Sequence, residues 1–234
     1  MKIARVSLAG IMLAALAEFV PAGPVSAAAR AVQVTVAGRS EAVKLANGPS
    51  ASQLIMVTAS SHTATYATLR AYQVTGTKRV LVFGPWTARA GYNGIAAPGR
   101  KREGDGRTPS GTYGFSFFFG VDPSPGVAFP YRRAYTDDYW DDDPASPRYN
   151  EWVDAKTTSP GRRPEPMHNA PAYDYAAVIA YNTARTPGLG SAIFLHVATG
   201  TATAGCVSLP QGELVKVLRW LRPADNPRIS ISAT

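Results

Sequence analysis

Ser191–Pro210, SAIFLHVATGTATAGCVSLP, carries both a candidate base and the only cysteine of the chain. Its first part is apolar and typical of a buried strand, which would deliver His196. A loop of small and hydroxyl-bearing residues follows, and Cys206 comes shortly before a helix that Pro210 opens. A strand, a turn and a returning segment can bring the histidine and the cysteine together.

Cys206 and His196 meet the demands of nucleophilic catalysis. A thiol attacks carbonyls only as the thiolate, which a helix beginning downstream favours through its partial positive charge. Histidine is a base that titrates near neutrality, and a Cys–His pair is a known activated nucleophile. Gly205 has no side chain, so a substrate carbonyl can approach closely and meet backbone N–H groups as an oxyanion forms.

No metal or other cofactor is expected. Zinc needs at least three protein ligands, and the remaining histidines, His62 and His168, lie far from the pair in the sequence. The acidic segment Asp137–Asp143 (DDYWDDD) lacks EF-hand spacing and a glycine turn. We interpret it as a solvated loop; the alternative is a site for a cation or a substrate amine.

The N-terminus has the pattern of a secretory signal peptide. Lys2 and Arg5 precede the apolar run Val6–Ala17, and small residues follow, with Val25–Ala27 as a cleavage site. The run is shorter than the roughly 20 residues that a membrane span needs. We therefore expect residues 1–27 to be removed, a secreted or cell-envelope location, and no stable transmembrane anchor. A lone cysteine in an exported protein indicates a reactive thiol or an intermolecular bridge.

The formal net charge of +8 allows contact with anionic wall polymers or lipid head groups. No long run of lysine and arginine interleaved with aromatic residues occurs, so nucleic-acid binding is not expected.

The rest of the chain predicts a mainly β protein, of mixed α+β class, with one helix after the cysteine. Residues 28–50 are alanine-rich and are interpreted as a linker or edge segment, and residues 51–234 as the catalytic domain. Leucine and valine recur at helical spacing over Gln211–Leu221, before Pro223. Short runs between Gly and Pro residues predict strands over Gln53–Ala59, Tyr66–Thr75, Lys78–Phe83, Gly111–Phe119, Ala176–Tyr181, Ala192–Val197 and Arg228–Ile231.

Two motifs resemble one known family. Thr203–Val207 (TAGCV) resembles the [S/T]-x-G-C-[V/I] nucleophile motif of YkuD-type L,D-transpeptidases, with His196 at the place of that family's histidine. Arg102–Tyr113 (REGDGRTPSGTY) resembles the family's glycine-rich turn and strand. The similarity extends from about Gln53 to Ile231, and it implies a barrel-like or sandwich arrangement of short strands.

The resemblance also implies an activity on peptidoglycan stem peptides. Cys206 would attack the carbonyl before the terminal D-alanine, expel D-alanine and hold the stem as a thioester. His196 would take the thiol proton and later deprotonate an acceptor amine. The carbonyl of Val197 would orient the histidine ring, and N–H groups around Gly205 would receive the oxyanion. Acylation by carbapenem β-lactams is implied as well.

Candidate substrate contacts are Thr203, Ser208, Tyr113 and Tyr173. The chain departs from the family pattern at Val197, where glycine is frequent, at Ala204, where histidine is frequent, and at Ser208, where arginine or asparagine is frequent. These departures leave the nucleophile and the base intact and indicate a divergent branch.

Three alternatives stay open beside the transpeptidase. An L,D-carboxypeptidase would use the same residues with water as the acceptor. A non-catalytic wall-binding module would keep the fold but would not need an activated thiol. A papain-like peptidase is less favoured, because there the cysteine precedes the histidine in the sequence.

Overall fold

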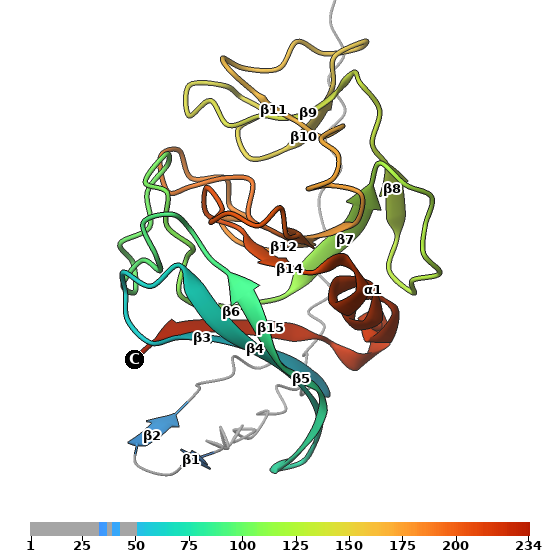
Figure 1. The fold of residues 1–234 in the computed structure, drawn as a ribbon. Coiled ribbons are helices and arrows are strands. Elements are labelled where there is room, and N and C mark those ends of the chain that lie inside the picture. Colours follow the sequence, from blue (N-terminus) through green and yellow to red (C-terminus); the bar gives the residue numbers. More distant parts are fainter. Residues whose placement is uncertain (1–32, 37–38, 43–50) are drawn as a thin grey trace, which may run out of the picture.

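The computed structural model describes residues 33–36, 39–42 and 51–234. It is a mainly β structure with a single α-helix among the described residues, as the sequence predicts (Figure 1). Strands β1 (Gln33–Val36) and β2 (Arg39–Ala42) pair only with each other in that part of the chain. The predicted signal peptide lies outside the described residues.

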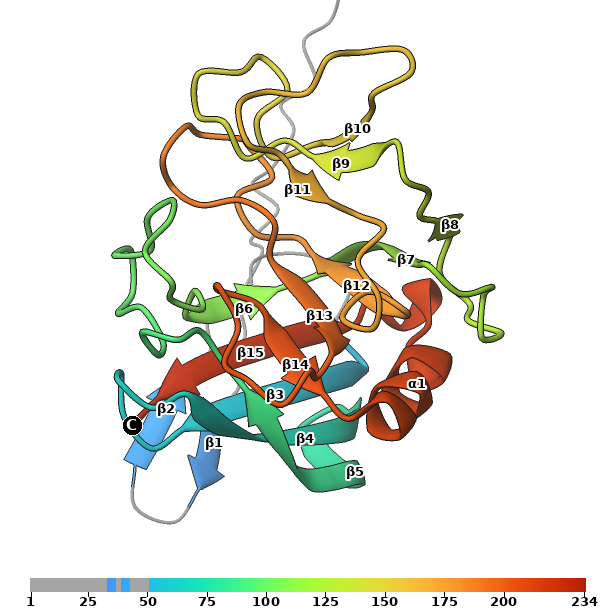
Figure 2. The ribbon, with the colours of Figure 1, turned by 45° about the horizontal axis from the view of Figure 1, so that its top comes forward.

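The main sheet has ten strands in the order β6-β15-β3-β4-β5-β14-β13-β12-β7-β8. The sheet curls, so its two halves form layers facing one another (Figures 1 and 2). In chain order its strands are β3 (Gln53–Ala59), β4 (Tyr66–Thr75), β5 (Lys78–Arg89), β6 (Gly111–Tyr113), β7 (Phe115–Gly120), β8 (Tyr131–Arg133), β12 (Ala176–Ile179), β13 (Phe194–Val197), β14 (Val207–Leu209) and β15 (Arg228–Ala233).

Alternating side chains build the main core between these layers. In β4, Ala67, Leu69 and Ala71 are buried, whereas the residues between them face the other side of the strand. The alternation in the sequence predicts this face. The main core also receives residues from β13, β14 and the helix, among them Leu195, Val207, Leu209, Leu214 and Leu218.

The helix α1 (Gln211–Trp220) closes one end of the main core. Leu214, Val217 and Leu218 form its buried stripe, which packs against β13 and β14. Pro210 stands at its N-cap, where a missing N–H costs nothing, and Leu221 ends it.

A second, smaller sheet covers the other face of β12 and β13. It joins β10 (Trp152–Asp154), β9 (Asp138–Trp140) and β11 (Glu165–Pro166), and it lies above the main sheet in Figure 1. We call residues 131–175 the insertion. Its aromatic side chains pack on those of the main sheet, and the resulting second core contains Phe119, Trp140, Met167, Tyr173, Phe194 and Cys206.

Two predicted strands differ from the structure. The expected strand Gly111–Phe119 is divided at Gly114 into β6 and β7, which pair with different neighbours, β15 and β12. The expected strand Lys78–Phe83 continues through Pro85 to Arg89, because the register shift between β4 and β5 near Arg70 lets the pairing resume beyond the proline.

Candidate active site

Cys206 and His196 project from the same face of adjacent strands. Strands β13 and β14 are parallel, with Leu195 opposite Val207 and His196 opposite Ser208. Val207 and Leu195 enter the main core, so Cys206 and His196, each one residue away, point to the opposite face. We call this the outer face. Burial agrees, because Cys206 packs in the second core. The structure thus brings the two predicted residues to one side of the sheet.

The sulfur of Cys206 hydrogen bonds to two backbone groups. It accepts a hydrogen bond from the N–H of Phe194 at 3.3 Å and donates one to the carbonyl of Ala192 at 3.2 Å. The residue is 6% exposed. Burial raises the pKa of the thiol, and the Glu165 carboxylate adds to that, while the Phe194 N–H and Lys101 act in the opposite direction. Cys206 therefore carries a thiol, not a thiolate.

His196 is held as a neutral base. Its Nδ1 lies 2.8 Å from the carbonyl oxygen of Val197, so the proton on Nδ1 is donated there and Nε2 keeps its lone pair. This is the orienting contact that the resemblance assigns to Val197. Burial lowers the pKa of His196 to about 4, although the carbonyls of Val197 and Ala172 partly offset the effect. The ring packs edge-to-face on Tyr173, with centroids 5.5 Å apart.

Two threonines fix the turn before β14. Thr203 Oγ1 donates to the carbonyl of Cys206 at 2.7 Å, and Thr108 Oγ1 donates to the same oxygen at 3.0 Å. The N–H of Gly205 donates to Thr203 Oγ1 at 3.2 Å. Thr203 therefore fixes the backbone of Cys206 through hydrogen bonds inside the turn. Because the Gly205 amide is already engaged, an oxyanion would need the N–H of Cys206 or displacement of that bond.

The helix does not support the thiolate as the sequence suggests. Strand β14 stands between Cys206 and the start of α1, and α1 packs on the main-core side of β14. A helix dipole acts within about one turn of its end. The prediction that the start of the helix stabilises the Cys206 thiolate is therefore wrong.

Three acidic side chains, Glu103, Asp142 and Glu165, lie near one another on the side of the insertion, and the charges of Glu165 and Asp142 act on the Cys206 thiol. Ser191 Oγ lies 2.7 Å from Glu103 Oε2 and 3.0 Å from Asp142 Oδ1, so its single proton bonds to one of the two carboxyl groups at a time. Tyr149 donates to Glu103, and Tyr173 donates to Glu165. Every carboxylate thus has a hydroxyl partner. Burial raises the pKa of Asp142 to about 8, and the charge of Glu165 adds to the effect. Burial also raises the pKa of Glu165.

The acidic segment Asp137–Asp143 is not the solvated loop that we predict. Asp138 belongs to β9 and accepts the indole N–H of Trp152 at 2.7 Å. Asp141 is 0% exposed and binds Ser146 and the N–H of Gly161. These aspartates hold the insertion together, because each accepts donors from segments far along the chain or across a turn.

The other candidate contacts fall in different places. Tyr173 is buried between His196 and Phe194, next to the nucleophile. Tyr113 lies in β6, bonds to the carbonyl of Ser110 and packs edge-to-face on Tyr181 beside the main core. Ser208 stands beside His196 in the register.

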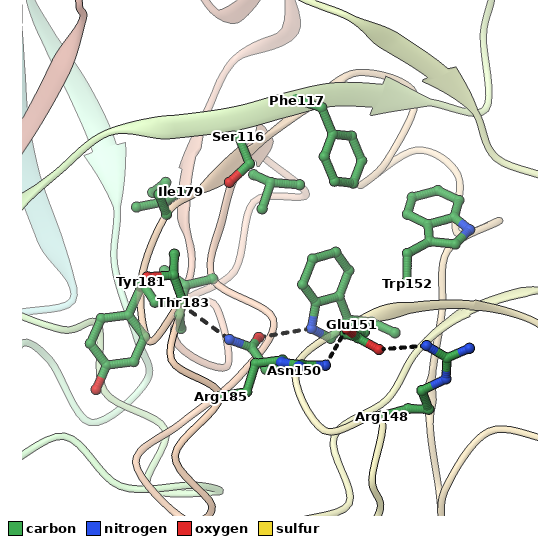
Figure 3. Close-up of a pocket in the computed structure, with 14 residues that line it drawn as sticks. Ser116, Phe117, Arg148, Asn150, Glu151, Trp152, Ile179, Tyr181, Thr183 and Arg185 are labelled. Carbon is green, nitrogen blue, oxygen red and sulfur yellow. Dashed lines mark hydrogen bonds and ion pairs between the residues drawn. The ribbon is translucent and has the colours of Figure 1, made fainter. Parts of the chain in front are cut away.

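A pocket of about 550 Å³ opens between the insertion and β12 (Figure 3). Phe117, Trp140 and Trp152 line it together with Glu151, which Arg148 and Arg185 both bind. Trp140 also packs edge-to-face on Phe194, whose N–H bonds to the Cys206 sulfur. The two tryptophans thus pack in the second core and also line the pocket.

Several residues around the pair are missing from the sequence prediction. Lys101 Nζ binds Asp105 Oδ1 at 2.6 Å and favours the thiolate of Cys206. Glu103, Asp142 and Glu165 converge from distant positions, so no spacing rule could join them. A buried charged residue leaves no periodic pattern of its own. Arg89 is likewise absent from the prediction, although the alternation of β5 places it on the outer face.

The described residues contain no helix long and apolar enough to cross a membrane. Within them, no three histidine, cysteine or acidic side chains are grouped as metal ligands.

Comparison with known proteins agrees with the motifs. A search of curated proteins finds no match. Among solved structures, the chain is similar to the helical cell shape determining protein Pgp2 from Campylobacter jejuni, with 15% identity and a TM-score of 0.38. That match covers 78% of this chain and 48% of the other, so this chain spans about half its length. The model of the YkuD L,D-transpeptidase catalytic domain matches residues 52–231, nearly all of the main domain. The chain therefore belongs to the YkuD family.

Proposed function

We propose that this protein is an exported peptidoglycan L,D-transpeptidase that acts through a Cys206 thioester. The observation that carries the proposal is the placement of Cys206 and His196 on one face of two paired strands. Membership of the YkuD family supports peptidoglycan as the substrate class. Export rests on the N-terminal sequence pattern alone.

The reaction has two halves. In the first, the Cys206 proton passes to Nε2 of His196 and the sulfur attacks the carbonyl before the terminal D-alanine. The C–N bond breaks, and D-alanine leaves with the proton from the histidine. In the second, an acceptor amine gives a proton to His196 and attacks the thioester, which releases the thiol. Water in place of the amine gives the carboxypeptidase.

We expect Cys206 to lose its proton to His196 only when the substrate binds. The thiol donates its hydrogen bond to the carbonyl of Ala192 and not to His196. Catalytic hydrogen bonds are frequently loose until substrate is bound. Burial lowers the pKa of His196 to about 4, which keeps the ring neutral but weakens it as a base, so it takes the proton only when the sulfur turns toward it and the two new charges stabilise each other. The carbonyl of Val197 then stabilises the imidazolium that forms.

A defined disaccharide-tetrapeptide tests the proposal. We expect wild-type protein to release D-alanine and to form either cross-linked dimers or tripeptide, as read by mass spectrometry. Cys206→Ala should abolish release, and His196→Ala should reduce it by about 10²–10⁴-fold, the usual contribution of a general base. A carbapenem should add its mass to wild type and not to Cys206→Ala.

His168→Ala is the matched control, because His168 is exposed and outside the site. It should keep wild-type activity. Full activity in Cys206→Ala would refute the mechanism. Equal binding of wild type and Cys206→Ala to sacculi, with turnover by neither, would favour the non-catalytic wall-binding module.

A further inference from the structure

A row of side chains crosses the outer face through His196. The sheet register pairs Tyr66 with Arg89, Arg89 with Ser208, and Ser208 with His196. Directly paired residues of neighbouring strands point to the same face. Arg89 and Ser208 therefore stand beside the base, on the side away from the three carboxylates.

The Arg89 guanidinium makes few hydrogen bonds in the structure. A guanidinium carries five N–H donors. Its Nη2 makes one long hydrogen bond, 3.5 Å to Thr65 Oγ1, and its Cζ lies 3.7 Å from the ring centroid of Tyr66. The Nε is buried and has no acceptor in the part of the chain that the structure describes. No acidic side chain of those residues forms an ion pair with it.

Ser208 has the same deficiency. It is 1% exposed, and within residues 51–234 its hydroxyl has no hydrogen-bond partner. A buried polar group without a partner costs free energy. The Arg89 guanidinium and the Ser208 hydroxyl lie on neighbouring strands and on the same face. One ligand can therefore accept hydrogen bonds from both. A carboxylate does so, because its two oxygens match the guanidinium fork and a hydroxyl.

We propose that Arg89 and Ser208 form a subsite for a carboxylate borne by the same carbon as the amine that His196 serves. This rests on the proposed function, in which His196 protonates a departing amine or deprotonates an attacking one. In an amino acid the nitrogen and the carboxyl carbon lie about 2.5 Å apart. Neighbouring strands lie about 4.8 Å apart. An amine at the His196 ring therefore directs its carboxylate over Ser208, within reach of the Arg89 side chain.

Access requires one movement. The Nε of Arg89 and the Oγ of Ser208 are both shielded from solvent. The Arg89 side chain is long and lies on a tyrosine that is 59% exposed, so it can turn without disturbing the core. The carboxylate then replaces the tyrosine ring as the partner of the cation.

Kinetics with two substrates tests the subsite. One is the disaccharide-tetrapeptide with a free terminal carboxylate, and the other carries a terminal carboxamide. Arg89→Gln should lower kcat/KM for the acid by about 10- to 100-fold, the value of a charge-assisted hydrogen bond, and leave the amide within about twofold. Arg70→Gln is the control, because Arg70 alternates onto the same face of β4 away from the row. It should leave both rates unchanged.

A binding measurement separates this proposal from the proposed function. N-acetyl-D-alanine should shift amide resonances of wild type and of Arg70→Gln, but not those of Arg89→Gln, and its carboxamide should shift none. Arg89-dependent binding without turnover would uphold the subsite and reject the transpeptidase. Turnover with an equal loss for acid and amide in Arg89→Gln, for the donor and for the acceptor alike, would reject the subsite and keep the transpeptidase.

The carboxylate can come from the departing D-alanine or from the acceptor. Exchange with a free D-amino acid, compared with its amide, distinguishes them. A loss in Arg89→Gln that follows the donor carboxylate assigns the subsite to the leaving group, and a loss that follows the acceptor carboxylate assigns it to the acceptor. Either result supports the subsite; a loss that follows neither overturns it.

Discussion

The two flanks of the Cys206–His196 pair differ in how their polar groups are satisfied. Toward the insertion, Glu103, Asp142 and Glu165 each contact at least one hydroxyl group at hydrogen-bond distance. Toward β5, Arg89 makes one long bond and Ser208 makes none within the described chain. Polar groups that hydrogen bond to one another stabilise the fold. Buried hydrogen-bond donors without an acceptor indicate a place where a ligand can bind. The flank with Glu103, Asp142 and Glu165, the acid flank, is therefore structural, and the flank with Arg89 and Ser208, the basic flank, is the one for which we propose a ligand.

The largest effect should come from Ser191→Ala on the acid flank. Ser191 is 6% exposed and its hydroxyl contacts both Glu103 and Asp142. Its loss leaves Asp142 without its hydroxyl partner and Glu103 with Tyr149 alone, which should cost about 2–3 kcal/mol of unfolding free energy. Urea denaturation at pH 7 measures this cost. A loss below about 0.5 kcal/mol, the range of ordinary surface substitutions, would show that the acid flank is not structural.

An intermediate effect should appear in the pH dependence of Asp142→Asn. The folded protein raises the pKa of Asp142 from 3.8 to about 8 by burial. Its stabilising contribution is thus complete below 3.8 and is lost as the pH rises through about 8. Between pH 5 and pH 6 wild type should lose about 1 kcal/mol more than the variant, because the unfolded chain has released this proton and the folded protein has not. Parallel pH curves for the two proteins would contradict this.

The smallest effect should come from Ser208→Ala on the basic flank. This variant is the counterpart of Ser191→Ala, since both serines are buried. Its hydroxyl has no partner in the described residues, so its removal should change stability by less than about 0.5 kcal/mol or raise it. The same urea titration applies. A destabilisation as large as that of Ser191→Ala would erase the difference between the flanks.

The sequence predicts what local patterns can carry. Alternation in β4 predicts its buried face, and proline with spaced leucines predicts α1. The motif around Cys206 and the histidine before it indicate the pair and the family. Each of these signals lies within a short stretch of sequence, where the spacing of apolar residues shows the period of a strand or a helix.

The sequence does not predict what depends on long-range pairing. Gly114 divides an apparently continuous strand because its two halves pair with β15 and β12, which come later in the chain. Asp141 looks solvated beside other acids, yet Ser146 and Gly161 supply its donors. Arg89 joins the site only through its register with Ser208. Each outcome is decided by partners that the local window does not contain.

The register of β13 and β14 has a consequence for recognising distant relatives. The hydrogen-bond ladder, not the connecting loop, sets the separation of the two side chains. Residues 198–202 can therefore lengthen or shorten over evolution while His196 and Cys206 keep their places. Counting positions between a histidine and a cysteine is a poor search rule. A better one looks for an apolar–histidine–apolar triplet that can lie alongside an apolar–polar–apolar triplet preceded by cysteine.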